Sequence, residues 1–160
     1  MNKPTHFDSE GKARMVNVSD KEITNRQARA TISIKLNKTS FEIARENRSA
    51  KGDVLTVAKL AGIQAAKRTS DLIPLCHQLP LNHVDIEFEL DSSQNVIKII
   101  STVNCSSRTG VEMEALTACS VAALTVYDML KAVQKDIVIS DLMLLAKKGG
   151  KSGDFVRENT

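Results

Sequence analysis

The chain has no tryptophan and a single tyrosine, Tyr127, among its 160 residues. Proteins that bind single-stranded nucleic acids usually stack bases on aromatic side chains. The net charge is +3, from 22 Lys and Arg against 19 Asp and Glu, which is too small to indicate a polyanionic partner. We therefore expect no nucleic-acid partner, while anionic small molecules stay compatible with this charge.

Cysteine is also scarce, with only Cys76, Cys105 and Cys119 and no C-x-x-C spacing. An odd, irregular set argues against a disulfide framework or a structural zinc site, and it fits a reducing cytoplasm. No apolar run approaches the ~18 uncharged residues of a membrane span, and the polar first residues lack the apolar core of a signal peptide. The sequence predicts a cytoplasmic protein without a membrane partner.

The length suits one domain over residues 1–160. We expect a loose N-terminal arm over residues 1–13 and a flexible C-terminal tail over residues 147–160, because both segments are polar. No internal repeat or low-complexity tract is evident.

Hydrophobic periodicity predicts the elements between these ends. Alternation predicts a strand over residues 30–37, a hairpin over residues 83–103 and one or two strand segments over residues 137–146, with a further short strand at residues 14–18. Helical spacing predicts a short helix capped by Thr39 and Glu42 and ending near Arg48, a longer one capped by Asp53, and a third from Thr109 and Gly110 to about Lys135. The order predicts a ferredoxin-like β-α-β-β-α-β fold of the α+β class, an antiparallel sheet with helices packed on one face.

The third helix is unusual because Asp128 is the only charged residue between Glu114 and Lys131. A helix that is apolar on nearly all sides is covered on more than one side, which predicts contact with another subunit. Helical geometry places Glu114, Asp128 and Lys131 on one face. An Asp–Lys pair is most often a simple ion pair, but desolvation in such a helix would perturb both pKa values, so a functional role is equally favoured.

The stretch DLIPLCHQLPL, residues 71–81, forms a rigid, non-helical loop because Pro74 and Pro80 fix its backbone. Cys76 alone is more often a small buried side chain than a nucleophile. His77 could carry a proton near neutral pH or lie in the core with a backbone partner. A metal site made of Cys76, His77 and His83 is the least favoured interpretation, because their spacing is irregular.

The segment KKGGKSGDF near the C-terminus does not complete a phosphate-binding P-loop, because Leu145 stands where that motif needs glycine. A cationic tail that closes over phosphates stays compatible with it. Lys51 lies beside the start of a helix, where anions bind readily, although an exposed turn lysine is the commoner outcome. Lys67 lies at the other end of that helix.

Three segments closely resemble the family of cyclic pyranopterin monophosphate synthase, molybdenum cofactor biosynthesis protein C. They are KGDVLTVAKLAGIQAAKRTSDLIPLCHQLPL, GVEMEALTACSVAALTVYDMLKAVQKD and LLAKKGGKSGDF. The resemblance covers nearly the whole chain. It implies a lyase that converts 3′,8-cyclo-7,8-dihydro-GTP into cyclic pyranopterin monophosphate and pyrophosphate, after a radical S-adenosylmethionine enzyme has supplied the substrate. It also implies a hexamer of three dimers, with active sites at the dimer interface.

Carried over by position, the family's catalytic residues fall on Asp128, Lys51 and Lys131. Its substrate contacts fall on Leu75, Cys76, His77, Met113 and Glu114, and its further charged positions on Lys67, Glu112 and Lys147. The family loop usually has proline after the histidine, whereas this chain has Gln78, which removes one restraint on His77. No cofactor or metal is implied, and the need for Mg²⁺ with the triphosphate stays open.

Two other classes of protein compete with this interpretation. A non-catalytic ferredoxin-like regulatory module would explain the fold and the apolar helix, but not Asp128 beside Lys131 together with Lys51. An unrelated phosphate-transfer enzyme is disfavoured by the incomplete P-loop.

Overall fold

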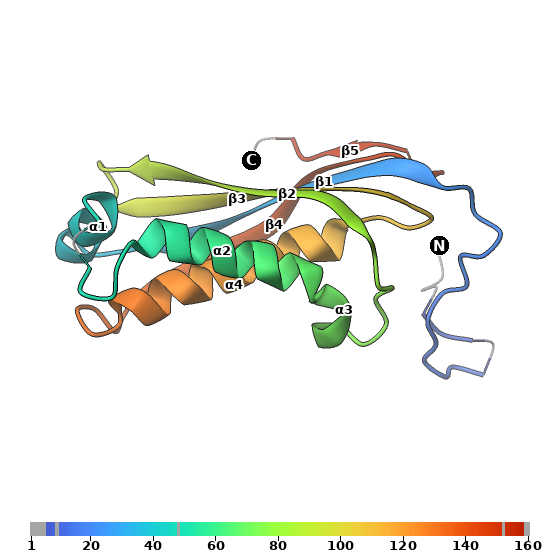
Figure 1. Ribbon diagram of the computed structural model, residues 1–160, viewed down its shortest axis with the longest axis horizontal. Coiled ribbons are helices and arrows are strands. Elements are labelled where there is room, and N and C mark those ends of the chain that lie inside the picture. The colour runs from blue at the N-terminus through green and yellow to red at the C-terminus, as the bar shows by residue number, and fades with distance from the viewer. Residues whose placement is uncertain (1–5, 9, 48, 152, 159–160) are drawn as a thin grey trace.

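The computed structural model describes residues 6–8, 10–47, 49–151 and 153–158. Within these residues, five strands and four helices follow one another (Figure 1). The strands are β1 (Thr24–Lys35), β2 (Leu81–Asp91), β3 (Val96–Ser107), β4 (Val138–Lys148) and β5 (Phe155–Val156). The helices are α1 (Lys38–Arg45), α2 (Val54–Lys67), α3 (Thr69–Leu72) and α4 (Glu112–Leu130).

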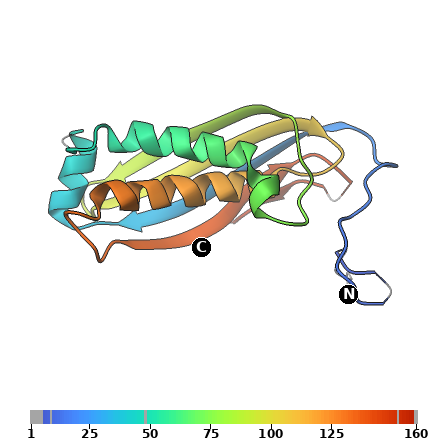
Figure 2. The same ribbon diagram turned by 60° about the horizontal axis from the view of Figure 1, so that its bottom comes forward.

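The strands form one antiparallel sheet in the order β2-β3-β1-β4-β5. β1 lies at the centre, paired with β3 from Thr24 to Lys35 and with β4 on its other edge. The long helices α2 and α4 lie side by side on one face of this sheet (Figures 1 and 2). This arrangement confirms the predicted ferredoxin-like α+β fold.

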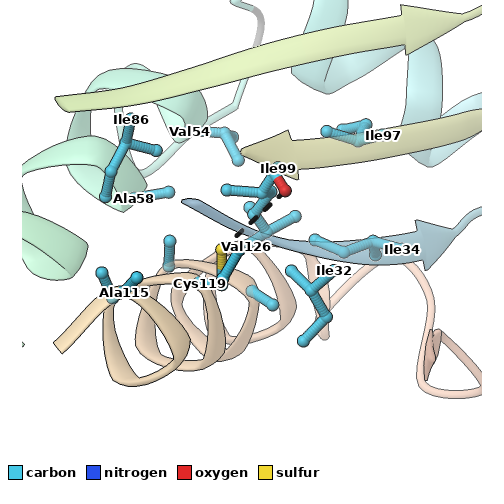
Figure 3. Packing of buried hydrophobic residues seen from close by; sticks show 14 of the residues in the cluster. Ile32, Ile34, Val54, Ala58, Ile86, Ile97, Ile99, Ala115, Cys119 and Val126 are labelled. Carbon is cyan, nitrogen blue, oxygen red and sulfur yellow. Dashed lines mark hydrogen bonds between the residues drawn. The ribbon is translucent and has the colours of Figure 1, made fainter. Parts of the chain in front are cut away.

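The core lies between the sheet and the two long helices (Figure 3). Branched side chains of the strands, such as Ile32, Ile86 and Ile99, face small side chains of the helices, such as Ala58 and Ala115. Large and small side chains on opposite surfaces can interdigitate at high density. The alternation of β1 and the alanine-rich composition of α2 and α4 therefore explain the tight packing of helices on sheet.

Gly62 sets the distance between α2 and α4. A β-carbon at this position would lie 2.2 Å from Ile86 Cδ1 and 2.8 Å from the carbonyl oxygen of Ala118. The second atom is backbone, so a side chain here would push the two helices apart. Since α4 carries Asp128 and ends at its C-cap Lys131, this contact also helps to position the site.

The structure confirms Asp53 as the cap of α2, because its carboxylate accepts from the backbone N–H of Thr56 at 2.9 Å. The predicted capping box of α1 is wrong. Asn37 caps this helix by accepting from the N–H of Ser40, and Glu42 pairs instead with Arg45. The helix ends at Arg45, and Arg48, where its end was expected, lies outside the described residues.

Several predicted boundaries change. The strand expected at residues 14–18 is absent from the described chain, where this segment has no regular secondary structure. β1 begins at Thr24 rather than residue 30, since its polar first half also pairs with β3. α4 runs from Glu112 to Leu130 rather than from Thr109 and Gly110 to Lys135. The segment predicted as a tail contributes its first two residues to β4 and Phe155–Val156 to β5, and its flexibility stays a prediction.

α4 is long and apolar enough to cross a membrane by length and composition, with a mean hydropathy of 1.3 over 18 residues. Of that window, 56% is buried against the rest of the chain. A core helix of a ferredoxin-like domain passes the same test, and the packing in Figure 3 gives α4 that role.

Candidate active site

Three of the predicted residues meet at the C-terminal end of α4. Lys131 donates to Asp128 Oδ1 at 2.5 Å, and Lys51, from the turn before α2, donates to the backbone carbonyl of Asp128 at 2.8 Å. The Lys51 ammonium also lies 3.5 Å from Asp128 Oδ2. We call Lys51, Asp128 and Lys131 the lysine–aspartate cluster.

The charges of this cluster are mutually stabilising. The hydrogen bond and charge of Lys131, followed by the charge of Lys51, lower the pKa of the Asp128 carboxyl below its ordinary value. In turn, the hydrogen bond that Lys131 donates to Asp128 raises the pKa of Lys131. All three side chains are about half exposed in the single chain. The cluster therefore presents two cations held by one carboxylate to whatever covers this end of the helix.

A cavity of about 250 Å³ lies at the opposite end of α4. We call it the ring cavity. Its walls come from the predicted loop, the start of α4 and the segment before β1, and include Val16, Leu75, Cys76, His77, Met113 and Glu114. All five loop and helix residues to which the family resemblance assigned substrate contacts therefore line one cavity.

Glu114 is the chemically distinctive residue of the ring cavity. It is 4% exposed, and burial, reinforced by the negative charge of Glu112, raises its pKa to about 7. A buried carboxyl without a cationic partner is poised between its neutral and charged forms near neutral pH. Glu114 can thus either donate a hydrogen bond to a ring atom or accept two from an amidine-like edge.

Cys76 and His77, the two loop residues with reactive side chains, differ in their surroundings. Burial, followed by the charge of Glu114, raises the pKa of the Cys76 thiol. A thiol kept protonated is a poor nucleophile, so the structure favours Cys76 as a half-buried wall residue. His77 Nε2 lies 2.9 Å from the carbonyl oxygen of Val16, so the histidine has a backbone partner and still lines the cavity.

A second cavity, of about 570 Å³, adjoins the first. We call it the cationic cavity. The two share the wall residues Lys21, Thr109, Gly110 and Glu112, so they adjoin, and we call them together the cleft. Six cationic side chains and two carboxylates line it: Lys21, Arg26, Arg108, Lys147, Lys148, Lys151, Glu22 and Glu112. Glu112 and Lys147, each predicted as a charged residue of the site, form an ion pair of 3.1 Å in its wall.

Of the six cationic residues that line this cavity, only Lys147 was predicted from the sequence as a site residue. Arg26 offered one signal, because it continues the inward-facing positions of β1, occupied by Ala28 and Ala30, with a charged side chain. Gly149 and Gly150 adopt φ values of 89° and 92°, which favour glycine. A β-carbon on Gly150 would lie 1.6 Å from Arg26 Nη1, so a side chain there would force the guanidinium to move.

The structure does not bring all predicted residues together in one chain. Glu112 and Asp128 are sixteen positions apart on α4, which corresponds to ~24 Å along the helix axis. Glu114 is buried near the start of α4, whereas Asp128 and Lys131 at its other end are about half exposed. Lys67 lies apart from both groups, in a hollow beside Asn82 and His83 at the start of β2.

Within the described parts of the chain, no three His, Cys, Asp or Glu side chains converge as a metal site would require. The three cysteines are free thiols, with Cys105 and Cys119 buried. Burial raises the pKa of Cys105 to about 11.

A cationic cavity beside a small, partly apolar one indicates a class of proteins that bind phosphorylated heterocycles. Comparison with known proteins narrows this class: residues 15–150 match the model of the MoaC family, and the chain belongs to that family. It is 56% identical over 154 residues to a protein of Heliobacterium modesticaldum named cyclic pyranopterin monophosphate synthase, with 96% of this chain and 97% of the relative covered. A protein of the same name from Peptoclostridium acidaminophilum is 53% identical over 155 residues, covering 97% and 98%.

Proposed function

We propose that this chain catalyses the reaction of a cyclic pyranopterin monophosphate synthase, a lyase of molybdenum cofactor biosynthesis. The substrate is 3′,8-cyclo-7,8-dihydro-GTP, and the products are cyclic pyranopterin monophosphate and pyrophosphate. The observation that carries the proposal is that the ring cavity and the cationic cavity adjoin through shared wall residues. Family membership over nearly the full length supports it independently.

The cleft matches the two ends of this substrate. The triphosphate needs dispersed positive charge, which Arg26, Arg108 and Lys147 provide in the cationic cavity. The purine-derived rings need a flat, partly apolar site with a few polar groups, which Met113, Cys76 and Glu114 provide. Glu114 in its charged form suits the N–H edge of a guanine ring, because a carboxylate can accept two hydrogen bonds from it.

The lysine–aspartate cluster supplies the remaining chemistry. Opening the five-membered ring and closing the pyrazine ring require several proton transfers, for which positioned amines and carboxylates are suited. In this proposal Asp128 orients Lys131, and the two lysines act as acid and base. Forming the cyclic phosphate expels pyrophosphate, and the lysines stabilise the negative charge that develops.

The two halves of the site meet when two copies of the chain pack together. The outward face of α4 runs from Met113 through Leu124 to Asp128, and Leu124 and the neighbouring Leu60 of α2 are 59% and 63% exposed. We assign this apolar face to a second copy. If the two α4 helices cross antiparallel near Ser120, Asp128 of one copy lies opposite Met113 of the other, since Ser120 is about midway between them.

Burial of the lysine–aspartate cluster in such a pair of chains would also change the pKa values of its lysines. Desolvation lowers the pKa of a lysine, and a lysine with a lowered pKa can release its proton near neutral pH. In the single chain Asp128 keeps Lys131 cationic. A second copy over the cluster would therefore convert a stable ion pair into an acid–base group, and three such pairs would make the expected hexamer.

The proposed chemistry uses side chains alone and requires no resident cofactor, while Mg²⁺ accompanying the triphosphate can be tested with EDTA. Three free thiols fit a reducing cytoplasm. The substrate would come from a radical S-adenosylmethionine enzyme one step earlier, because a carbon–carbon bond between ribose and purine must be made without an activated leaving group.

The test is anaerobic incubation of the purified protein with 3′,8-cyclo-7,8-dihydro-GTP, measuring pyrophosphate and pterin together. We expect both products in equal amounts. Binding without either product, in correctly assembled protein, would contradict the proposal and favour a regulatory module that binds a ligand between subunits.

A further inference from the structure

Residues 14–23, which we call the N-terminal strap, run across the cleft before β1 begins. The strap has no regular secondary structure and is largely exposed, with Met15 52% and Ile23 60% exposed. Its alternate residues Val16 and Val18 are half-buried and line the ring cavity. The strap therefore forms a wall of the cavity without belonging to the core.

Two hydrogen bonds tie the strap to the loops that make the cleft. The carbonyl oxygen of Val16 lies 2.9 Å from His77 Nε2, and the carbonyl oxygen of Lys21 accepts from Arg108 Nε at 2.9 Å. One tie is in the ring cavity and the other is in the cationic cavity. The strap thus contacts one polar side chain in each cavity, His77 in the ring cavity and Arg108 in the cationic cavity.

The tie to His77 fixes the position of its proton. A carbonyl oxygen can only accept a hydrogen bond, so Nε2 must carry the proton and donate it. In the neutral imidazole the other nitrogen, Nδ1, then has a free lone pair. The strap consequently decides which nitrogen of His77 can accept a hydrogen bond or a proton from a ligand.

We propose that the N-terminal strap is a positioning element of the site, which closes the ring cavity and holds His77 as the Nε2-protonated tautomer, with Nδ1 as the acceptor offered to substrate. This inference rests on the proposed function for its kinetic consequence, but not for the state of His77 in the free protein. Because few contacts hold the strap, it can open to admit substrate and close again without disturbing the core.

The first experiment compares the wild type with a variant that lacks residues 2–18, which removes the Val16 carbonyl, both valines and His6, a further residue of the cavity wall. We expect KM to rise about tenfold, equivalent to ~1.4 kcal/mol, while the melting temperature stays unchanged. Long-range ¹H–¹⁵N spectra of histidine-labelled protein without substrate report on His77 directly. We expect a slowly exchanging Nε2 proton in the wild type and its loss to solvent exchange in the deletion variant.

A matched pair of substitutions keeps the test decisive if the deletion variant does not fold. Val16→Gly with Val18→Gly removes the side chains that face the cavity, whereas Met15→Gly with Ser19→Gly loosens the backbone equally through exposed residues. We expect the first pair to raise KM and speed exchange of the Nε2 proton, and the second to change neither. Unchanged KM and unchanged His77 spectra in the first pair and the deletion variant would overturn the proposal. If the wild type forms no product, the proposed function fails, while the spectra still test the strap.

Discussion

Lys51 and Asp128 are 77 positions apart in the sequence, yet the Lys51 ammonium donates to the Asp128 backbone carbonyl at 2.8 Å and lies 3.5 Å from its carboxylate. The packing of α2 against α4 brings them together. An i,i+3 pair such as Asp128 and Lys131 is common on helices. A second lysine from a distant turn is harder to explain by helix stability, and it gives the cluster two cations for one carboxylate.

The cluster predicts that Lys131→Ala lowers kcat by about 10²- to 10⁴-fold, the usual contribution of a positioned acid–base group. Lys51→Ala should lower kcat by a similar factor. The double variant should lower kcat by less than the product of the two single factors, because both lysines contact Asp128. Steady-state pyrophosphate release measures both. Lys59→Ala is the matched control, since Lys59 pairs with Asp85 outside the cluster. Loss of assembly in Lys131→Ala would instead make this lysine structural.

A site shared between two copies predicts complementation. Asp128→Asn damages one half of the site and Glu114→Gln the other, so a mixed pair of copies keeps one intact site. Co-expression of the two inactive variants should restore about a quarter of the wild-type activity, because random pairing makes half of the pairs mixed and each has one intact site. The control combines Asp128→Asn with Lys131→Ala, which damage the same half and should restore nothing. Failure of the first mixture would place the whole site within one chain.

The fold could be predicted from the sequence because its elements have strong local signals. Alternation in β1 and β2, the Asp53 cap and the apolar α4 each determine an element with little help from the rest of the chain. The position of residues 14–23 could not be predicted, because it depends on contacts with His77 and Arg108, which are distant in the sequence. The cap at Asn37 likewise involves a distant residue, since its backbone N–H donates to Gln134 Oε1. For the same reason, the local pattern around Arg26 shows a charged residue on an inward face without revealing its place in the cationic cavity.

Gly62→Ala should destabilise the protein by about 1–3 kcal/mol, the usual cost of overpacking a dense core. The added methyl would contact the Ala118 carbonyl, which can move only if α2 and α4 separate. Urea unfolding of the two proteins measures the loss. Gly52→Ala is an instructive comparison, because Gly52 has open space around it but a φ of 100°, so its cost would come from backbone strain alone. Equal stability of Gly62→Ala and wild type would show that the helices can separate freely.

The raised pKa of Glu114 predicts that the stability of the protein depends on pH. Its pKa is about 7 in the folded chain and ordinary in the unfolded chain, so the folded state binds more protons between about pH 4.5 and 7. The free energy of unfolding should therefore fall as pH rises through this window, by about 3 kcal/mol at most. Glu114→Gln, which stays neutral, should remove this fall and be more stable than wild type at pH 8. Parallel curves for the two proteins would contradict the assignment.

The cationic cavity predicts that Arg26 binds the phosphates and that Gly150 leaves room for it. Arg26→Ala should weaken pyrophosphate binding by about 10- to 100-fold, since a hydrogen bond to a charged group contributes ~1.5–3 kcal/mol. Arg29→Ala is the matched control, because Arg29 lies exposed on the same strand outside the cleft.

Gly150→Ala should reproduce much of the Arg26→Ala effect, because the new methyl would occupy the position of the guanidinium and strain a backbone with φ of 92°. Calorimetric titration with pyrophosphate measures all three variants. Combining Arg26→Ala with Gly150→Ala should add little to either change if both act on the same phosphate contact. A fully additive loss would mean that the Gly149–Gly150 turn and Arg26 bind the phosphates separately.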